Sequence, residues 1–236
     1  QLMIARGFTL LEVLVAVAIS ATVGIAAVQL LSNISGVNKA SIDKADDLAA
    51  LQRLNQVMGR DLAQYINRPV RDEYGDTIPA LMIGSGDYPV ELTIAGWRNN
   101  PVTEDPRSTL QRIAYRTEDI FSEACEPALE RIAYEQGLDP DDADVAGECL
   151  VRYYWKVLDR GDVSDPLAQV VYDLIEEVRF EAVVSTPSTT DIPELNAVDY
   201  WAPVTDVEGA RIAAIKVFYT APGYGEIMRQ WPVSNE

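Results

Sequence analysis

The carboxylates and two cysteines of this protein are its candidate side chains for catalysis or metal binding. The protein contains no histidine. Without histidine there is no Ser-His-Asp or Cys-His catalytic unit and no His-ligated zinc site. Asp72 and Glu73 are adjacent acids, and paired carboxylates can hydrolyse glycosidic bonds. Neighbouring side chains on a strand point to opposite faces, however, so this pair does not fit a catalytic site. We therefore predict no catalytic residue and no cofactor.

A second group of carboxylates has the close spacing of oxygen ligands for a hard cation such as Ca²⁺. It comprises Asp139, Asp141, Asp142 and Asp144. The EF-hand pattern is not met, because Ala143 occupies the third ligand position and the required glycine and distal glutamate are out of place. A solvated acidic surface is the favoured interpretation, and calcium binding by these aspartates is the weaker hypothesis.

The acidic residues are concentrated in one segment. Residues 118–148 hold eleven acidic side chains and one basic one, Arg131, and so carry −10 of the formal net charge of −18. Cys125 and Cys149 lie at or near the ends of this segment. We predict an exposed insertion loop, closed by a disulfide and containing a short helix at 127–136. Two unpaired thiols are the alternative, whereas a disulfide would agree with an oxidising compartment such as a periplasm.

The net charge also argues against a nucleic-acid surface, since phosphates would be repelled.

Near the N-terminus, residues 8–31 form an apolar run with Glu12 as its one ionisable residue. Residues 8–28 would span about 31 Å as a helix, and a bilayer core is about 30 Å thick. We predict a transmembrane helix rather than a buried core helix. A secretory signal fits poorly, because the run is too long and no A-x-A site follows it. Arg6 precedes the run, so the positive-inside tendency places the N-terminus in the cytoplasm and the bulk of the protein outside.

Glu12 requires an explanation, since a carboxylate inside the hydrocarbon costs about 2.5–3.5 kcal/mol on insertion scales. It either lies near the end of the helix and reaches the headgroups, or pairs with a cation. If the polypeptide were cut between Gly7 and Phe8, the new amine of Phe8 would lie one helical turn away and would be cationic near neutral pH. In a bundle of such helices, pairing of Glu12 with a neighbour's Phe8 amine would fix the axial register between subunits.

The elements after the span predict an α+β fold. An amphipathic pattern over 32–66 continues the helix, with a break near Ser35-Gly36 and an end at Arg68-Pro69. Its apolar stripe packs on a sheet, or else forms a seam with a partner helix; the stripe comprises Ile34, Val37, Ala45, Leu48, Leu51, Met58 and Leu62. Alternating patterns predict strands at 90–94, 110–115, 150–158, 178–184, 212–219 and 228–231, and 167–177 reads as a short helical turn.

The N-terminal residues also resemble a known processing site. Arg6-Gly7-Phe8-Thr9-Leu10-Leu11-Glu12 is similar to the site in type IV prepilins and in pseudopilins of type II secretion systems. The resemblance implies that a prepilin peptidase cuts after Gly7 and N-methylates Phe8, and that Glu12 supports subunit docking. It also implies a pilin-like fold, with a long N-terminal helix packed on antiparallel β-sheet. The expected parts are a leader (1–7), a transmembrane helix (8–31), its periplasmic continuation (32–67) and a β-rich periplasmic domain (68–236).

Five central blocks narrow the resemblance to the minor pseudopilin J family of type II secretion systems. They read RDLAQ (60–64), RPVRDE (68–73), ELTIAGWRN (91–99), LQRIAYR (110–116) and YWKVLDR (154–160). The resemblance implies a structural role, without catalysis, in a complex at the pseudopilus tip in the Gram-negative inner membrane. Its implied partners are minor pseudopilins I, K and H, the major pseudopilin, and exoprotein cargo or the secretin. Glu12 favours J over K, which typically lacks this glutamate.

Two other functions remain as alternatives. A minor pilin of a type IV pilus, acting in assembly or adhesion, would carry the same N-terminal motif, and the central blocks alone argue against it. A membrane-tethered periplasmic binding domain or enzyme is the less favoured alternative, because no set of residues in the sequence suggests its site.

Overall fold

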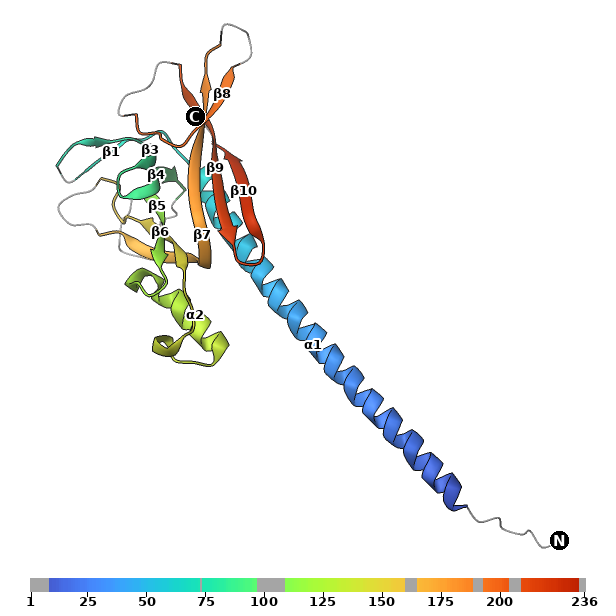
Figure 1. Ribbon diagram of the computed structural model, residues 1–236. Helices are drawn as coiled ribbons and strands as arrows, with labels where there is room; N and C mark the ends of the chain where they lie inside the picture. The colour runs from blue at the N-terminus through green and yellow to red at the C-terminus, as the bar shows by residue number, and fades with distance from the viewer. Residues whose placement is uncertain are drawn as a thin grey trace. The chain divides into compact units, whose positions relative to one another are not determined.

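The computed structural model describes residues 9–72, 74–96, 109–159, 165–188, 193–203 and 209–233. The protein divides into two compact units, Gln1–Leu51 and Gln52–Glu236, and one continuous helix, α1 (Leu10–Ala63), runs through the division (Figure 1). In the first unit residues 9–48 are exposed, and the helix is long and apolar enough to cross a membrane. The predicted break near Gly36 is wrong. One glycine costs a helix about 1 kcal/mol, and an existing helix propagates cooperatively through it.

The end of α1 is set by the sheet rather than by Pro69. After Ala63 the backbone pairs with β4 (Tyr88–Ala95): the Ile66 N–H donates to the Thr93 carbonyl (3.0 Å), and the Ala95 N–H donates to the Gln64 carbonyl (2.8 Å). The helix therefore stops before the predicted Arg68-Pro69 boundary, because the residues that follow it are taken up by strand hydrogen bonds.

An antiparallel sheet makes up most of the second unit, with strand order β3-β4-β5-β6-β7-β9-β10 and β8 paired to β7. A separate two-stranded ribbon joins β1 and β2. The strands are β1 (Val70–Arg71), β2 (Thr77–Ile78), β3 (Leu81–Ser85), β4 (Tyr88–Ala95), β5 (Leu110–Asp119), β6 (Glu148–Tyr154), β7 (Leu167–Thr186), β8 (Glu194–Val198), β9 (Arg211–Ala221) and β10 (Gly225–Pro232). Every predicted strand overlaps one of these, but the one predicted at 150–158 ends at Tyr154, since the residues after it form bends.

The long strand β7 connects two halves of the sheet (Figure 1). Its first half pairs with β6 and its second half with β9 and β8. Between the halves the register shifts at Glu176–Arg179, and Glu177 has φ of 51°. The helical turn predicted at 167–177 is therefore wrong: pairing with β6 overrides the helix-forming residues of this segment, as tertiary context commonly overrides local propensity.

Within the second unit, the last turns of α1 pack on the sheet. Leu54, Met58 and Leu62 are fully buried. The Tyr219 hydroxyl of β9 donates to Asn55 Oδ1 (3.2 Å). Gly59 is required for the approach of β10, since a Cβ there would lie 2.8 Å from Trp231 Nε1.

By contrast, the stripe residues Ile34, Val37 and Leu48 in the first unit are exposed. For these residues, packing on the sheet and a seam with a partner helix both stay predictions.

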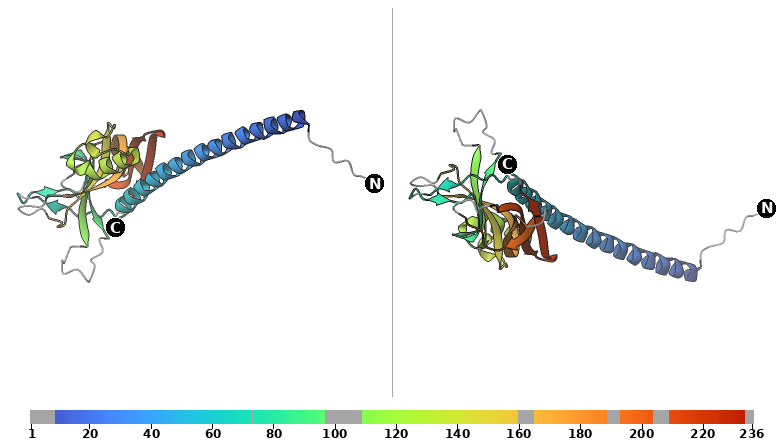
Figure 2. Two further views of the ribbon diagram at one scale, coloured as in Figure 1. Left: turned by 90° about the horizontal axis from the view of Figure 1, so that it is seen from below. Right: turned by 90° about the horizontal axis from the view of Figure 1, so that it is seen from above.

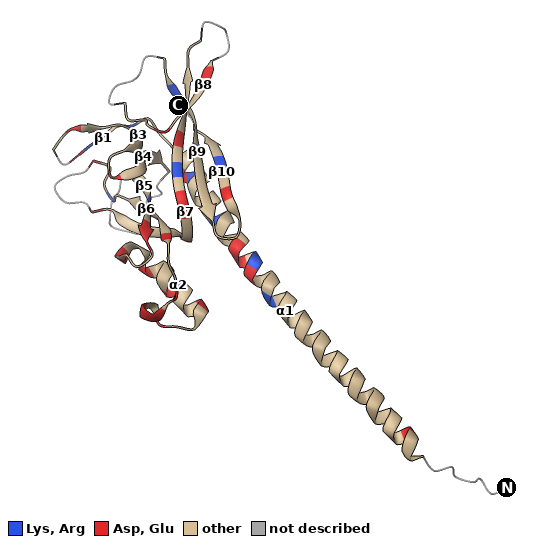
Figure 3. Cartoon of the chain, in the orientation of Figure 1, with Lys and Arg blue, Asp and Glu red and all other residues tan. Residues whose placement is uncertain are grey.

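The acidic segment is folded, which corrects the prediction of a loop. It contains the 3-10 turn η1 (Glu123–Cys125), the helix α2 (Glu126–Gln136) and the 3-10 turn η2 (Pro140–Asp142). Arg131 of α2 forms an exposed ion pair with Asp173 of β7 (2.5 Å). Figure 2 shows α2 lying alongside the sheet. The acidic residues of α2 and η2 are exposed, and Figure 3 marks their positions along the backbone in red. The helix predicted at 127–136 is confirmed.

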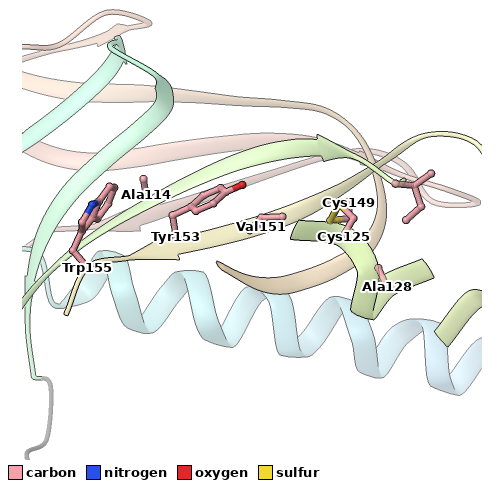
Figure 4. Close-up of a cluster of buried hydrophobic side chains, with 8 residues drawn as sticks. Ala114, Cys125, Ala128, Cys149, Val151, Tyr153 and Trp155 are labelled. Carbon is pink, nitrogen blue, oxygen red and sulfur yellow. A yellow bond between two sulfur atoms is a disulfide. The ribbon is translucent and has the colours of Figure 1, made fainter. Parts of the chain in front are cut away.

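Apolar packing explains why this acidic segment folds. Figure 4 shows Trp155, Tyr153 and Val151 in a row that leads to the disulfide between Cys149 and Cys125, with Ala128 of α2 near it. All of these are buried. Cys125 and Cys149 are joined with a Cα–Cα distance of 6.0 Å. A small apolar core and one disulfide therefore stabilise the segment that bears the acidic surface. Closing a loop of this length by a disulfide contributes about 3 kcal/mol to folding stability in the chain-entropy model.

Candidate functional site

The N-terminal carboxylate takes part in a local hydrogen-bond motif. Thr9 immediately precedes α1, its N–H donates to Glu12 Oε2 (3.0 Å), and the Glu12 N–H donates to Thr9 Oγ1 (3.3 Å). This reciprocal pair is a capping box, in which a Thr side chain and a Glu three residues later satisfy backbone donors of the first turn. A carboxylate at this position also complements the helix dipole. Gly7 and Phe8, the predicted processing residues, lie outside the described residues.

The capping box gives Glu12 a local role beside the predicted role in docking. The Thr9 hydroxyl also donates to Glu12 Oε2 (3.1 Å), so both hydrogen bonds that the Glu12 carboxylate accepts from Thr9 use one oxygen. Because a carboxylate has about four acceptor positions, capping and docking are compatible.

A buried ionic cluster joins the end of α1 to the middle of the sheet. Asp61 is fully buried, and its Oδ2 accepts hydrogen bonds from Arg152 Nε of β6 (2.5 Å) and from the Tyr115 hydroxyl of β5 (2.8 Å). Its Oδ1 accepts from Arg60 Nη2 (3.2 Å) and Nε (3.3 Å). Both carboxylate oxygens are therefore saturated by donors.

Burial and charge shift the pKa values within this cluster. Burial first, and the Asp61 charge second, raise the pKa of Tyr115 well above its usual value. Burial lowers the pKa of Arg152, but the charge and hydrogen bond of Asp61 outweigh burial and leave this pKa raised. The tyrosine thus stays neutral and the arginine stays charged, which keeps Asp61 paired.

A second buried ion pair lies on the opposite face of β5. Arg112 and Glu91 are almost completely inaccessible, and Arg112 Nε donates to Glu91 Oε1 (2.8 Å). Arg112 Nη1 also donates to the carbonyls of Pro79 (2.8 Å) and Ala80 (3.0 Å) and to Thr93 Oγ1 (3.0 Å). This arginine therefore fastens the segment before β3 to the sheet.

A polar cavity of about 550 Å³ opens beside the Asp61 cluster. Its lining includes Arg60, Asp61, Gln64, Gln111, Arg152 and Gln169. These residues come from α1, the turn after it, and strands β5, β6 and β7. Two guanidinium groups face one carboxylate there, so the lining carries a net charge of one unit positive in a protein of −18.

The calcium candidates are not gathered into a ligand cage. Asp141 and Asp142 lie in η2, and Asp139 precedes it without a side-chain cap. Asp144 is tied through its backbone to Gln136, whose Oε1 accepts from the Asp144 N–H (3.1 Å). Among the described residues, no group of three or more acidic, cysteine or histidine side chains is arranged to hold a metal ion.

Sequence reasoning missed the partners inside the buried clusters. The RDLAQ block predicted no partner for Asp61, but Asp61 meets Arg152 across a separation of 91 residues. The central blocks could have indicated these clusters, because they contain four of the residues involved: Asp61, Glu91, Arg112 and Tyr115. Charged residues within strand patterns, as at positions 112 and 152, mark sites where burial requires a partner. Trp97 of the same blocks lies outside the described residues.

Comparisons with known proteins agree with these observations. The family model "Type II secretion system (T2SS), protein J" matches residues 29–144, and the "Prokaryotic N-terminal methylation motif" matches residues 2–28. "Type II secretion system protein J" from Escherichia coli is 36% identical over 132 residues, which are 54% of this chain and 63% of that protein. The protein of the same name from Klebsiella pneumoniae is 34% identical over 131 residues, or 55% of this chain and 62% of that protein. These matches confirm the resemblance to protein J, and they span less than two thirds of the relatives' length.

A solved structure shares the fold. One polypeptide in the crystal structure of the GspK-GspI-GspJ complex, from the type 2 secretion system of enterotoxigenic Escherichia coli, aligns with a TM-score of 0.53 at 21% identity. The alignment covers 80% of this chain and 99% of that one. The predicted α+β fold, a long apolar N-terminal helix with antiparallel β-sheet, is confirmed by this likeness and by the strands themselves.

Proposed function

We propose that this protein, similar to protein J of the type II secretion system, is a minor pseudopilin of such a system. In this role it is a structural, non-catalytic component of the pseudopilus tip complex, and it promotes pseudopilus assembly and protein export across the outer membrane. The observation that carries the proposal is the pairing, in one polypeptide, of an N-terminal methylation motif at 2–28 with a protein J match at 29–144.

The membrane arrangement follows from the same features. The apolar part of α1 would anchor the protein in the inner membrane by a single pass, with the N-terminus in the cytoplasm and the second unit in the periplasm. The disulfide between Cys125 and Cys149 supports an oxidising compartment for that unit. A prepilin peptidase would cut after Gly7 and methylate Phe8. The assembly partners would be minor pseudopilins of the I, K and H kinds and the major pseudopilin, with exoprotein or secretin contacts at the tip.

The intact mass of the protein extracted from membranes tests the assignment. We expect a protein that starts at N-methylated Phe8 and retains the disulfide. A protein that keeps residues 1–7 in a strain with an active prepilin peptidase would contradict the proposal. A deletion strain distinguishes the two filament systems: lost secretion with normal twitching supports the pseudopilin, and the reverse result supports a minor pilin of a type IV pilus.

Glu12 variants separate the docking role from the capping role. Glu12→Gln keeps a side chain that completes a capping box but removes the charge, and Thr9→Ala removes the cap but keeps the carboxylate. If the charge docks subunits, Glu12→Gln and Glu12→Ala lose co-purification with the other minor pseudopilins, while Thr9→Ala retains it. Normal co-purification of Glu12→Gln, together with failure of Thr9→Ala, would limit Glu12 to capping the helix.

A further inference from the structure

The polar cavity at the end of α1 has features that the pseudopilin assignment does not use. Its lining is rich in donors, because Asp61 is saturated by Arg60, Arg152 and Tyr115 and offers no free acceptor. Arg152 Nη2 donates to Gln111 Oε1 (3.4 Å), which leaves the Gln111 amide nitrogen as the group with donors to spare. The one carboxylate of the lining is therefore already paired, which disfavours a cationic ligand.

Arg60 is the group best placed to meet a ligand. Its side chain is 59% exposed at the cavity. Its two hydrogen bonds to Asp61 are long, at 3.2 and 3.3 Å, and both go to the same oxygen. The fork of a guanidinium binds a carboxylate more strongly through two parallel bonds of about 2.7–2.9 Å. An incoming carboxylate can therefore engage Arg60 while Asp61 keeps its bonds to Arg152 and Tyr115.

The remaining lining adds neutral donors and room. The side-chain amides of Gln64 and Gln169 line the cavity. A Cβ at Gly96 would lie 2.8 Å from the Gln64 amide, so glycine there leaves space for that amide. The volume of about 550 Å³ falls within the usual range of ligand sites, roughly 300–1,000 Å³, and far exceeds the needs of a single inorganic anion.

We propose that this cavity binds a carboxylate presented by a short peptide segment, with Arg60 as the charged anchor and the glutamine amides as further donors. The carboxylate comes either from the terminus of a polypeptide or from an acidic side chain, and the chemistry of recognition is the same for both. The inference stands independently of the pseudopilin assignment, because it rests on the lining residues of this protein alone.

Calorimetric titration of the full-length protein in detergent tests the inference with four probes. They are a blocked alanine-leucine tripeptide with a free C-terminal carboxylate, its C-terminal amide, the same amide with one residue replaced by glutamate, and inorganic phosphate. We expect one or both carboxylate peptides to bind, more weakly as NaCl is raised, and the neutral amide not to bind. Binding of the free acid alone identifies a polypeptide terminus, and binding of the glutamate amide identifies a side chain.

Two matched variants assign the site. Arg60→Gln should weaken carboxylate binding about tenfold, or by about 1.4 kcal/mol, since it removes the charge from the hydrogen bond. Arg53→Gln makes the same charge change on an exposed helix position outside the lining and should bind as the parent does. Equal binding of acid and amide, equal affinity of Arg60→Gln and Arg53→Gln, phosphate binding as tight as the peptides, or no binding by either carboxylate peptide would each overturn the inference.

Discussion

Asp61 lies buried where the last turns of α1 meet the sheet. It is completely buried, and three side chains from three elements donate to it. Breaking a buried ion pair by removing one partner leaves an uncompensated charge, at a cost of about 3–5 kcal/mol, whereas replacing both partners by apolar groups is often neutral. We therefore expect the cluster to specify how helix and sheet meet more than it stabilises them.

The first prediction concerns this pair. Asp61→Ala should lower the free energy of unfolding by about 3–5 kcal/mol, measured by urea denaturation of the full-length protein. The double variant with Arg152→Met should be less destabilised than Asp61→Ala alone, because the buried guanidinium is gone. Tyr115→Phe, which removes one hydrogen bond, should cost about 1 kcal/mol. Strictly additive effects of the two substitutions at 61 and 152 would refute the pairing as the cause.

A second prediction concerns alkaline pH. Burial, followed by the hydrogen bond to Glu118, raises the pKa of Tyr153 to about 12, and its hydroxyl donates to Glu118 Oε1 at 2.5 Å. The unfolded tyrosine loses its proton near pH 10, so the unfolded state binds fewer protons than the folded state between about pH 10 and 12. Stability contributed by this group is complete below about pH 10 and is lost as pH rises toward about 12.

Tyr153→Phe isolates this contribution. Its unfolding free energy should fall less steeply than that of the parent between about pH 10 and 12, as followed by chemical denaturation at fixed pH values. Other groups that titrate in the same range are common to both proteins and cancel in the difference. Parallel pH profiles for the two proteins would show that the proton of Tyr153 does not contribute.

Among the elements, β7 shows why helix propensity led to a wrong prediction for residues 167–177. Residues 167–177 include alanine, glutamine, leucine and two glutamates, which favour helix. The same residues form the strand that pairs with β6 from Glu148 to Tyr154, so the partner strand determined the conformation. Glu177 then takes a left-handed backbone conformation at the shift between the two halves of the sheet.

The backbone at Glu177 supports a third prediction. A left-handed conformation costs a residue with a Cβ about 1–2 kcal/mol, and glycine avoids this cost but loses more entropy on folding. Glu177→Gly should therefore stabilise the fold by up to about 1 kcal/mol, measured by thermal or urea unfolding. Glu176→Gly is the matched control, since Glu176 pairs with Thr220 and glycine there should destabilise the fold. If both variants lose stability equally, the positive φ carries no cost.

For the molecule as a whole, the uneven distribution of charge affects the salt dependence of stability more than the surface ion pairs do. The formal net charge is −18, of which residues 118–148 hold −10. The exposed pair Lys44–Asp47 has side chains that are 62% and 52% exposed, and such pairs contribute little. The buried pairs at Asp61 and Glu91 are screened less by salt. Repulsion among the exposed carboxylates therefore dominates the response to ionic strength.

This balance leads to a fourth prediction. Raising NaCl from about 20 mM to about 300 mM, which shortens the screening length several-fold, should increase the Tm of the full-length protein. Asp141→Asn combined with Asp142→Asn removes two exposed charges from η2 and should reduce that increase, as measured by calorimetry at both salt concentrations. A fall in Tm with salt would mean that screened attractions outweigh the repulsion.

Local patterns were enough to predict the features that arise from interactions between near neighbours. The apolar run with Glu12, the alternating strands and the helix within the acidic segment all follow from composition and periodicity, which act over a few residues. The folded arrangement alone established that Asp61 meets Arg152 and Tyr115, and that residues 167–177 form a strand. These features depend on contacts between residues distant in the sequence, where burial forces each charge or backbone polar group to find a partner that no local pattern can name.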